Sequence, residues 1–365
     1  MKKFLIYVFL FLSSLNLCFA DETTILPSQL GVVQNVEYID TDNDVAQVKQ
    51  LADIKLLKGD LKGNYVQLDN MLTGNPYYDI KLKKGMKVIL HVEETDGELD
   101  FSIEDVQRAP VLLWLSFIFC GLLVYVGRKK GIYSLVSIVV TCVLIINLLS
   151  PMILAGINPL LSTILICLLS TAVTMYLVGG FNRKSTSATI GCTLSLVIAG
   201  IMSFITAKTA SLTGFSNENS MFLYSAHPEL NFVSITVSTM ILATLGAVMD
   251  VGMSIASTIN EIFSIDNTKT VKELFVSGMN VGRDVIGTMA NTLILVYLGA
   301  SLPLVLLATN IDLQKFINLN QVVTEISSAL IGSCAIVICV PITAIVASEL
   351  IKNMPQKIDF TNFEE

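Results

Sequence analysis

The stretch Gly246-Ala-Val-Met-Asp-Val-Gly-Met-Ser-Ile-Ala-Ser257 places an ionisable residue, Asp250, inside a run of apolar and small residues long enough to cross a bilayer. A second charged pair, Arg283 and Asp284, opens the next such run. Charged side chains at membrane depth are costly, so they tend to face a helix bundle or a water-filled cavity and to mark a working site. The sequence therefore predicts a functional site at these residues, within a membrane domain.

The composition indicates that lipid surrounds most of the chain. Of its 365 residues, 53% are hydrophobic and 15% are charged, and the mean hydropathy is +0.69. A soluble domain of this length carries more polar surface. The acidity is confined to residues 21–108, which hold 17 Asp and Glu against 9 Lys and Arg, whereas the remainder holds 13 against 14. The sequence has no basic patch, so nucleic acid is not expected as a partner.

The first 108 residues predict an export segment followed by a small domain. Residues 1–20 have the charged start, apolar stretch and small final residue of a secretory signal. The alternative is an uncleaved anchor helix, which is short for a span of about 20 residues. Residues 21–108 predict an extracytoplasmic β-rich domain, an OB-like barrel, because turn-forming Asp, Asn and Gly separate five short strand patterns. The expected strands are 30–39, 47–57, 65–69, 87–93 and 99–103.

Residues 109–352 predict an α-helical polytopic membrane domain of about seven transmembrane helices, followed by a cytoplasmic tail at 353–365. Each apolar run approaches the length that a membrane helix needs. The basic residues gather on alternate loops, around Arg128, Arg183 and Lys269, which are expected in the cytoplasm. The C-terminus is then cytoplasmic. The runs are 111–126, 133–149, 160–178, 188–206, 232–259, 285–308 and 329–350.

The run at 232–259 is longer than a bilayer requires. As a straight helix its 28 residues extend about 42 Å, against a hydrocarbon core of about 30 Å. One alternative is a break near Gly252, since broken helices build midplane sites in many transporters. The other is protrusion of the helix into the cytoplasm, which would bring Asp250 toward the cytoplasmic side.

Helical spacing gathers polar residues on single faces. One set is Gly246, Asp250, Ser254 and Thr258; the next run supplies Asn280, Asp284, Gly287, Thr288 and Asn291. We interpret these faces as a polar lining that binds a solute or ion. The alternative is that Asp250 and Arg283 form only a structural ion pair. In the run at 188–206, a stripe of Gly191, Ser195, Ala199 and Ser203 is instead typical of close helix packing.

The sequence does not predict an enzyme. Its two histidines, His91 and His227, form no metal-binding or catalytic motif, and the seven cysteines all lie in apolar segments without metal spacing. The stretch Gly179-Gly-Phe-Asn-Arg-Lys-Ser185 lacks the glycine that a phosphate loop places before its lysine. An acidic loop at 40–44 lacks the glycine and the final glutamate of a calcium loop. We therefore expect no cofactor, no resident metal and no nucleotide site.

Several segments together resemble the YibE/F-like family of bacterial membrane proteins. The likeness is carried by the stretch quoted first, by Glu261, and by Glu273-Leu-Phe-Val-Ser-Gly-Met-Asn-Val-Gly-Arg-Asp-Val-Ile-Gly-Thr-Met-Ala-Asn-Thr-Leu-Ile-Leu295. It extends through Gly156-Ile-Asn-Pro159, Asn182-Arg-Lys-Ser185, Leu212-Thr-Gly214, Gly332-Ser333 and Pro341-Ile-Thr343. The resemblance implies a multi-pass protein of the bacterial plasma membrane, and it implies no defined activity.

Two classes of function follow from these patterns. The first is a secondary transporter or permease for a small solute or ion, in which Asp250 and Asp284 bind a cation or proton. Arg283 is then a counter-charge or gate, and Asn280, Thr288, Asn291 and Ser254 line the site. The second is a membrane sensor or an assembly or scaffold protein whose exported domain binds a ligand or partner. Both classes are compatible with a homo-oligomer or with a partner protein in the membrane.

Overall fold

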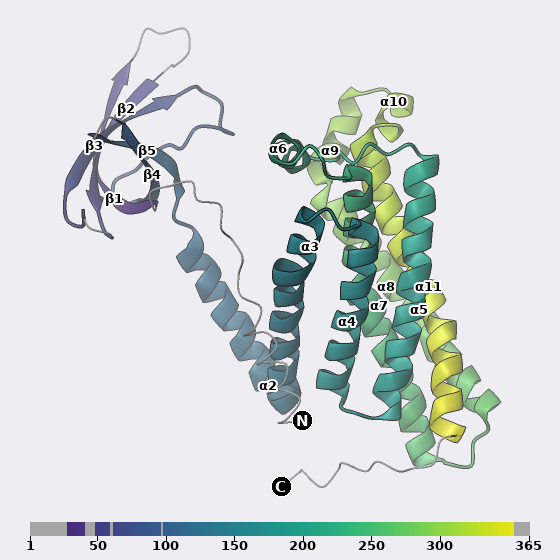
Figure 1. Cartoon of the computed structure of the whole chain (residues 1–365). Helices are drawn as coiled ribbons and strands as arrows, with labels where there is room; N and C mark the ends of the chain where they lie inside the picture. Colours follow the sequence, from purple (N-terminus) through teal and green to yellow (C-terminus); the bar gives the residue numbers. More distant parts are fainter. Residues whose placement is uncertain (1–27, 41–47, 59–60, 96–97, 354–365) are drawn as a thin grey trace. The chain divides into compact units, whose positions relative to one another are not determined.

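The computed structural model describes residues 28–40, 48–58, 61–95 and 98–353. The predicted signal segment, the acidic loop after residue 40 and the C-terminal tail lie outside the described residues. The chain divides into two units, a β-domain unit at Cys18–Leu122 and a helical unit that includes Leu123–Glu365. Each unit is described by itself (Figure 1).

The β domain is one antiparallel sheet of five strands: β1 (Gln29–Asp40), β2 (Val48–Leu56), β3 (Tyr65–Leu72), β4 (Lys87–Thr95) and β5 (Glu98–Val106). The strand order is β3-β2-β1-β4-β5, and the outer strands β3 and β5 approach each other. This is the order of an OB barrel, so the predicted OB-like domain is confirmed. Alternate residues of β2, among them Ala52, Ile54 and Leu56, are buried in its core, as the period of a strand requires.

Within the described residues, six helical segments are long and apolar enough to cross a membrane. The two expected spans at 111–126 and 133–149 are joined in one of them, Ala109–Leu154, which has a non-helical kink at Arg128 (φ 49°, ψ −130°). Gly131 is needed just after this kink, because a Cβ there would lie 2.1 Å from the Leu123 carbonyl oxygen. The chain therefore turns sharply between the two predicted spans.

The elements of the helical unit follow in chain order. They are α2 (Ala109–Leu144), η1 (Ile145–Leu149), α3 (Ser150–Leu154), α4 (Pro159–Gly179), α5 (Arg183–Thr209), α6 (Glu218–Ala226), α7 (Phe232–Ile265), α8 (Val271–Ala300), α9 (Leu302–Leu307), η2 (Ala308–Asn310), α10 (Leu313–Ile317) and α11 (Asn320–Asn353). Side-chain oxygens of Asn182, Asn231 and Thr270 cap the starts of α5, α7 and α8 by accepting backbone N–H bonds. Polar residues in the connections thus set where three of the long helices begin.

Helix α7 lies at the centre of the bundle, packing against α4, α5, α8 and α11. Small residues allow this close approach. The predicted stripe on α5 is entirely buried, and a Cβ on Gly191 would lie 2.0 Å from Thr343 Oγ1 of α11. On α7 itself, a Cβ on Gly252 would lie 2.3 Å from Cys192 Sγ of α5. The interpretation of the α5 stripe as packing is confirmed.

Helix α7 continues without a break through Gly252. The alternative of a break near Gly252 is therefore wrong, because Gly252 packs closely against α5. With 34 residues the helix is about 51 Å long, which exceeds a hydrocarbon core of about 30 Å. Tilt or protrusion remains to accommodate the excess.

The packing of Gly191 gives a first prediction. Gly191→Ala forces a methyl group against the backbone and hydroxyl of Thr343, so we expect it to lower the free energy of unfolding by about 1–3 kcal/mol. The measurement is a thermal melt of the full chain in detergent. Gly121→Ala on α2 is the matched control, since no described atom lies within 4 Å of a Cβ there. Equal melting temperatures for the two variants would contradict the packing.

Candidate functional site

On the outward face of α7, none of the exposed residues between Phe232 and Ser264 is large and apolar. The exposed residues in this interval are Thr239, Ala243, Gly246, Asp250, Ser254, Glu261 and Ser264. Those up to Glu261 share one helical face and are called the α7 stripe. The outward residues of neighbouring helices are different, as Leu161 of α4, Ile201 of α5 and Ile345 of α11 show. The α7 stripe is therefore not a surface suited to lipid tails.

The outward face of α8 is also polar between Asn280 and Thr292. Its exposed residues there include the predicted lining, and we call the set Asn280, Arg283, Asp284, Gly287, Thr288, Asn291 and Thr292 the α8 face. The opposite side of the helix packs into the bundle through Gly278, Gly282, Val285 and Met289. The structure thus brings all the predicted residues of α8 to one exposed side.

The charged residues of the two helices lie at similar depth. A Cβ on Gly282 would lie 3.3 Å from Cδ1 of Ile255, and one on Gly278 would lie 2.6 Å from Cδ1 of Ile259, so α7 and α8 run antiparallel side by side. Counting about 1.5 Å per residue from Gly282 and Ile255 puts Asp284 and Asp250 within about one turn of each other along the bundle. Two carboxylates and one guanidinium therefore share a level.

None of these three charged groups takes part in an ion pair within the described part of the chain. The guanidinium Nη1 of Arg283 donates to Asn280 Oδ1 at 3.0 Å, on the same helix. The structural ion pair between Asp250 and Arg283, which was the alternative interpretation of the sequence, is not formed in the described residues. The charges are therefore free to meet groups other than the described residues.

Hydroxyl groups beside the carboxylates donate hydrogen bonds to carbonyl oxygens of their own helix. Ser254 Oγ donates to the Asp250 carbonyl oxygen at 2.7 Å, and Thr288 Oγ1 donates to the Val285 carbonyl oxygen at 3.1 Å. A hydroxyl that donates inward keeps its lone pairs as acceptors. Carboxylate, hydroxyl and amide oxygens are hard ligands, suited to a proton or a hard cation. In the described residues, no group of three or more His, Cys, Asp or Glu converges as a metal site.

The structure adds residues that sequence reasoning missed. Thr239, Ala243 and Glu261 extend the α7 stripe, and a spacing that mixes steps of three and four residues, as the period of a helix requires, would have found them. Glu325 lies inside α11 and is half-buried. It was missed because the apolar run begins only at residue 329, whereas Asn320 begins the helix.

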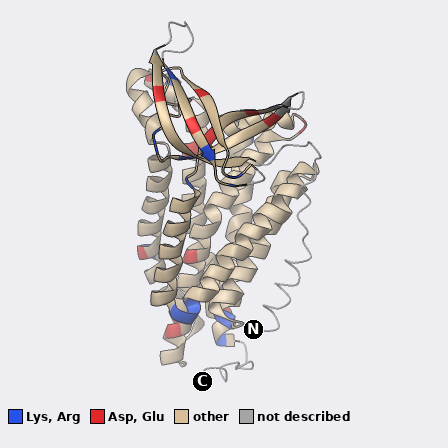
Figure 2. Cartoon of the chain, turned by 90° about the vertical axis from the view of Figure 1, so that its left-hand side faces the viewer, with Lys and Arg blue, Asp and Glu red and all other residues tan. Residues whose placement is uncertain are grey.

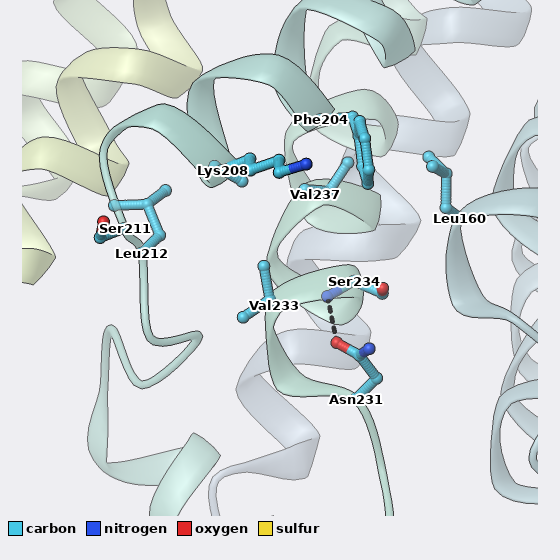
Figure 3. Close-up of a pocket in the computed structure, with 10 residues that line it drawn as sticks. Leu160, Phe204, Lys208, Ser211, Leu212, Asn231, Val233, Ser234 and Val237 are labelled. Atoms are coloured by element: carbon cyan, nitrogen blue, oxygen red, sulfur yellow. Dashed lines mark hydrogen bonds between the residues drawn. The ribbon is translucent and has the colours of Figure 1, made fainter.

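A hollow of about 370 Å³ lies elsewhere, at the ends of α4, α5 and α7 (Figure 3). Its lining includes Phe204, Lys208, Asn231 and Val237. Asn231 is occupied as the helix cap, accepting from the Ser234 backbone N–H at 2.9 Å. Val237 precedes Asp250 by 13 residues, about 20 Å along α7. This hollow is therefore separate from the charged residues, and no predicted site residue lines it.

The opposite ends of the helices are tied together by hydrogen bonds to backbone oxygens. Arg183 Nη1 donates to the Ile351 carbonyl oxygen at 2.9 Å, and Lys352 Nζ donates to the Asn267 carbonyl oxygen at 3.0 Å. In the turn before α8, donors of Thr268 bond the Asp266 carboxylate and hold its pKa below the usual value. Basic residues gather toward this end of the helices, whose middle portions carry few charges (Figure 2).

These features define a class, a polytopic helical membrane protein with an N-terminal β-barrel domain and charged residues at depth in two adjacent helices. A family model described as YibE/F-like protein matches residues 115–353, and one described as YibE/F family N-terminal domain matches residues 29–106. The chain belongs to the YibE/F family, as the sequence resemblance indicated. Comparison with curated proteins and comparison with solved structures each give no match.

The contrast between helix faces predicts a difference in contact with water. Ala243→Cys on the α7 stripe should react with N-ethylmaleimide at least about tenfold faster than Leu194→Cys on the outward face of α5, because a thiol ionises in water and not in lipid. The measurement is the labelling rate in native membranes, taken as the increase over the unmodified chain. Equally slow labelling at both positions would show that the α7 stripe is dry.

Proposed function

We propose that this protein is a secondary transporter or permease that moves a small solute or ion across the bacterial plasma membrane. Asp250 and Asp284 bind the cation or proton, and Arg283 is the counter-charge. The oxygens of Asn280, Ser254, Thr288 and Asn291 line the site. The single observation that supports this role is the presence of both carboxylates, at one level, on outward faces of α7 and α8 that expose small and polar groups.

The energetic cost of these charges favours a working role over a structural one. On insertion scales, each charged residue at the centre of a membrane helix costs about 2.5–3.5 kcal/mol. A structural role would be filled better by pairing the charges with each other, and no such pair is formed in the described residues. Groups that bind and release a cation must instead stay accessible.

The proposed orientation places the β domain outside and the C-terminus in the cytoplasm. The support is the gathering of basic residues toward the helix ends at the turn before α5, the turn before α8 and the end of α11 (Figure 2). Because the sequence has no nucleotide motif, the energy for transport would come from an ion gradient or from a partner ATPase.

Replacing Asp250 tests the carboxylate role. Asp250→Asn should abolish transport while the protein remains inserted, because the amide cannot bind a proton or balance a cation; Asp250→Glu should retain part of the activity. The measurement begins with metal and metabolite profiles of cells with and without the protein, followed by flux of the species identified into proteoliposomes.

Glu261→Gln is the matched control for this substitution. Glu261 is also an exposed carboxylate of the α7 stripe, and it lies about 16 Å further along the helix. We expect its replacement to leave flux unchanged. Wild-type flux in Asp250→Asn would exclude the proposed role of that carboxylate.

A sensor or assembly role has its own supporting observation. The β domain exposes aromatic side chains, with Tyr38, Tyr65, Tyr77 and Tyr78 each at least 65% exposed. Exposed aromatic rings are enriched where proteins bind partners. In this second candidate the barrel binds a ligand or protein, and the helices anchor it.

Removal of the β domain separates the two candidates. A chain that joins residue 20 to residue 109 should retain flux if the helices form the transport path, because all the proposed ligands lie on α7 and α8. The assay is the proteoliposome flux used for Asp250→Asn. Complete loss of activity from a well-inserted protein would favour the sensor.

A further inference from the structure

The described residues of the helical unit leave the α7 stripe and the α8 face uncovered. We propose that a second copy of this chain covers them, with Arg283 of each copy paired to Asp284 of the other. The two copies would then enclose the site together. What the interface encloses rests on the proposed function, whereas the interface itself rests on charge and shape alone.

Lipid is a poor occupant of this surface. Asp250, Arg283 and Asp284 are all exposed, and among the described residues Arg283 bonds only the Asn280 amide oxygen, on its own helix. A guanidinium and two carboxylates facing hydrocarbon are each costly. The cost is relieved when opposite charges meet in a protein interface that excludes lipid.

The shape of the surface suits another helix. A Cβ on Gly246 or on Gly287 would have no atom of the described residues within 4 Å, so both glycines have room beside them. Small residues at such positions allow the backbone of a neighbouring helix to approach closely. The lipid-suited faces of α4, α5 and α11 carry large residues such as Leu165, Phe204 and Leu330 instead.

Charge complementarity favours a second copy as the occupant. A two-fold axis along the membrane normal places the same helix of each copy side by side and parallel, so residues of equal depth meet. Arg283 and Asp284 differ in depth by about 1.5 Å and point about 100° apart. Each guanidinium can therefore face the other copy's carboxylate, and the contact forms twice. A carboxylate has two oxygens that accept, so Asp284 can meet the guanidinium of the other copy and still join Asp250 in binding the ligand.

Residues 109–122, the first part of α2, are not suited to cover the α7 stripe and the α8 face. Its residues Val111, Leu113, Trp114 and Phe117 are large, apolar and exposed, and its segment 109–122 holds no acidic residue to meet Arg283. Its one hydroxyl, on Ser116, donates to the Leu112 carbonyl oxygen at 2.8 Å. This part of α2 therefore has no charged group that could pair with the guanidinium of Arg283.

Cysteine cross-linking of the full chain in native membranes tests the interface. Leu295 continues the α8 face beyond Asn291 and is 55% exposed, and Ile201 of α5 is equally exposed at 55%. With copper phenanthroline as oxidant, Leu295→Cys should form a disulfide-linked species of twice the chain mass, at least tenfold more than Ile201→Cys. The wild-type chain gives the baseline for the native cysteines.

Charge exchange tests the pairing. Arg283→Asp alone and Asp284→Arg alone should each reduce the Leu295→Cys dimer at least tenfold, because like charges then face each other. The double exchange, Arg283→Asp with Asp284→Arg, should restore it, because the two charges are again complementary across the axis. Restoration would not follow if each residue acted only within its own copy.

The outcomes are separable from those of the transport assay. No dimer at Leu295→Cys, a cross-link of another mass, or a double exchange as poor as the single variants overturns the second copy as occupant. If a single charge variant fails to insert, the comparison of Leu295→Cys with Ile201→Cys still decides. A dimer that forms normally in Asp250→Asn, with flux unchanged, supports the interface and rejects the transport role.

Discussion

The cost of exposing charge to hydrocarbon is the constraint on which this architecture depends. Asp250 sits on the most central helix of the bundle, yet it faces outward rather than into the core. Arg283 and Asp284 do the same on the next helix. A chain that places three charges at one level on adjacent outward faces needs water, a ligand or another protein surface beside them. The transport proposal and the proposed second copy are both answers to that need.

Close packing elsewhere in the bundle explains why the outward face of α7 is small and polar. Glycine, alanine and serine on α5 bring α7 and α11 so near that Gly191 and Gly252 have no room for a side chain. Large apolar residues of α7, among them Ile241 and Ile255, are buried in that core. Small and polar groups are then what α7 presents on its remaining side. The buried side of α7 therefore packs the core, and its exposed side carries the candidate site.

Much of the fold was accessible from the sequence because its signals are local. Turn residues separated the five strands, and the strand order then agreed with an OB barrel. Apolar runs located the long helices, although the ends were extended by caps such as Asn231 and Thr270 that hydropathy does not register. Helical periodicity also placed the candidate residues on common faces, and this agrees with the structure.

What local signals could not provide was the direction of each face. Nothing in the run around Asp250 says whether its polar side points into the chain or away from it, because that depends on which neighbours α7 contacts. Gly252 likewise suggested flexibility, whereas Cys192 of α5, sixty residues earlier in the chain, makes it a packing position. Glu325 escaped notice because a helix can begin in polar sequence before its apolar run.

The tethers Arg183–Ile351 and Lys352–Asn267 carry a mechanical consequence. They fasten α5, α11 and the turn after α7 at one end, so these elements resist sliding past one another there. Helix α8 is held differently, with one long side against its neighbours and the other bare. The 266–270 turn is therefore the fastened end of α8, and any movement of this helix relative to α5 and α11 would be smallest there.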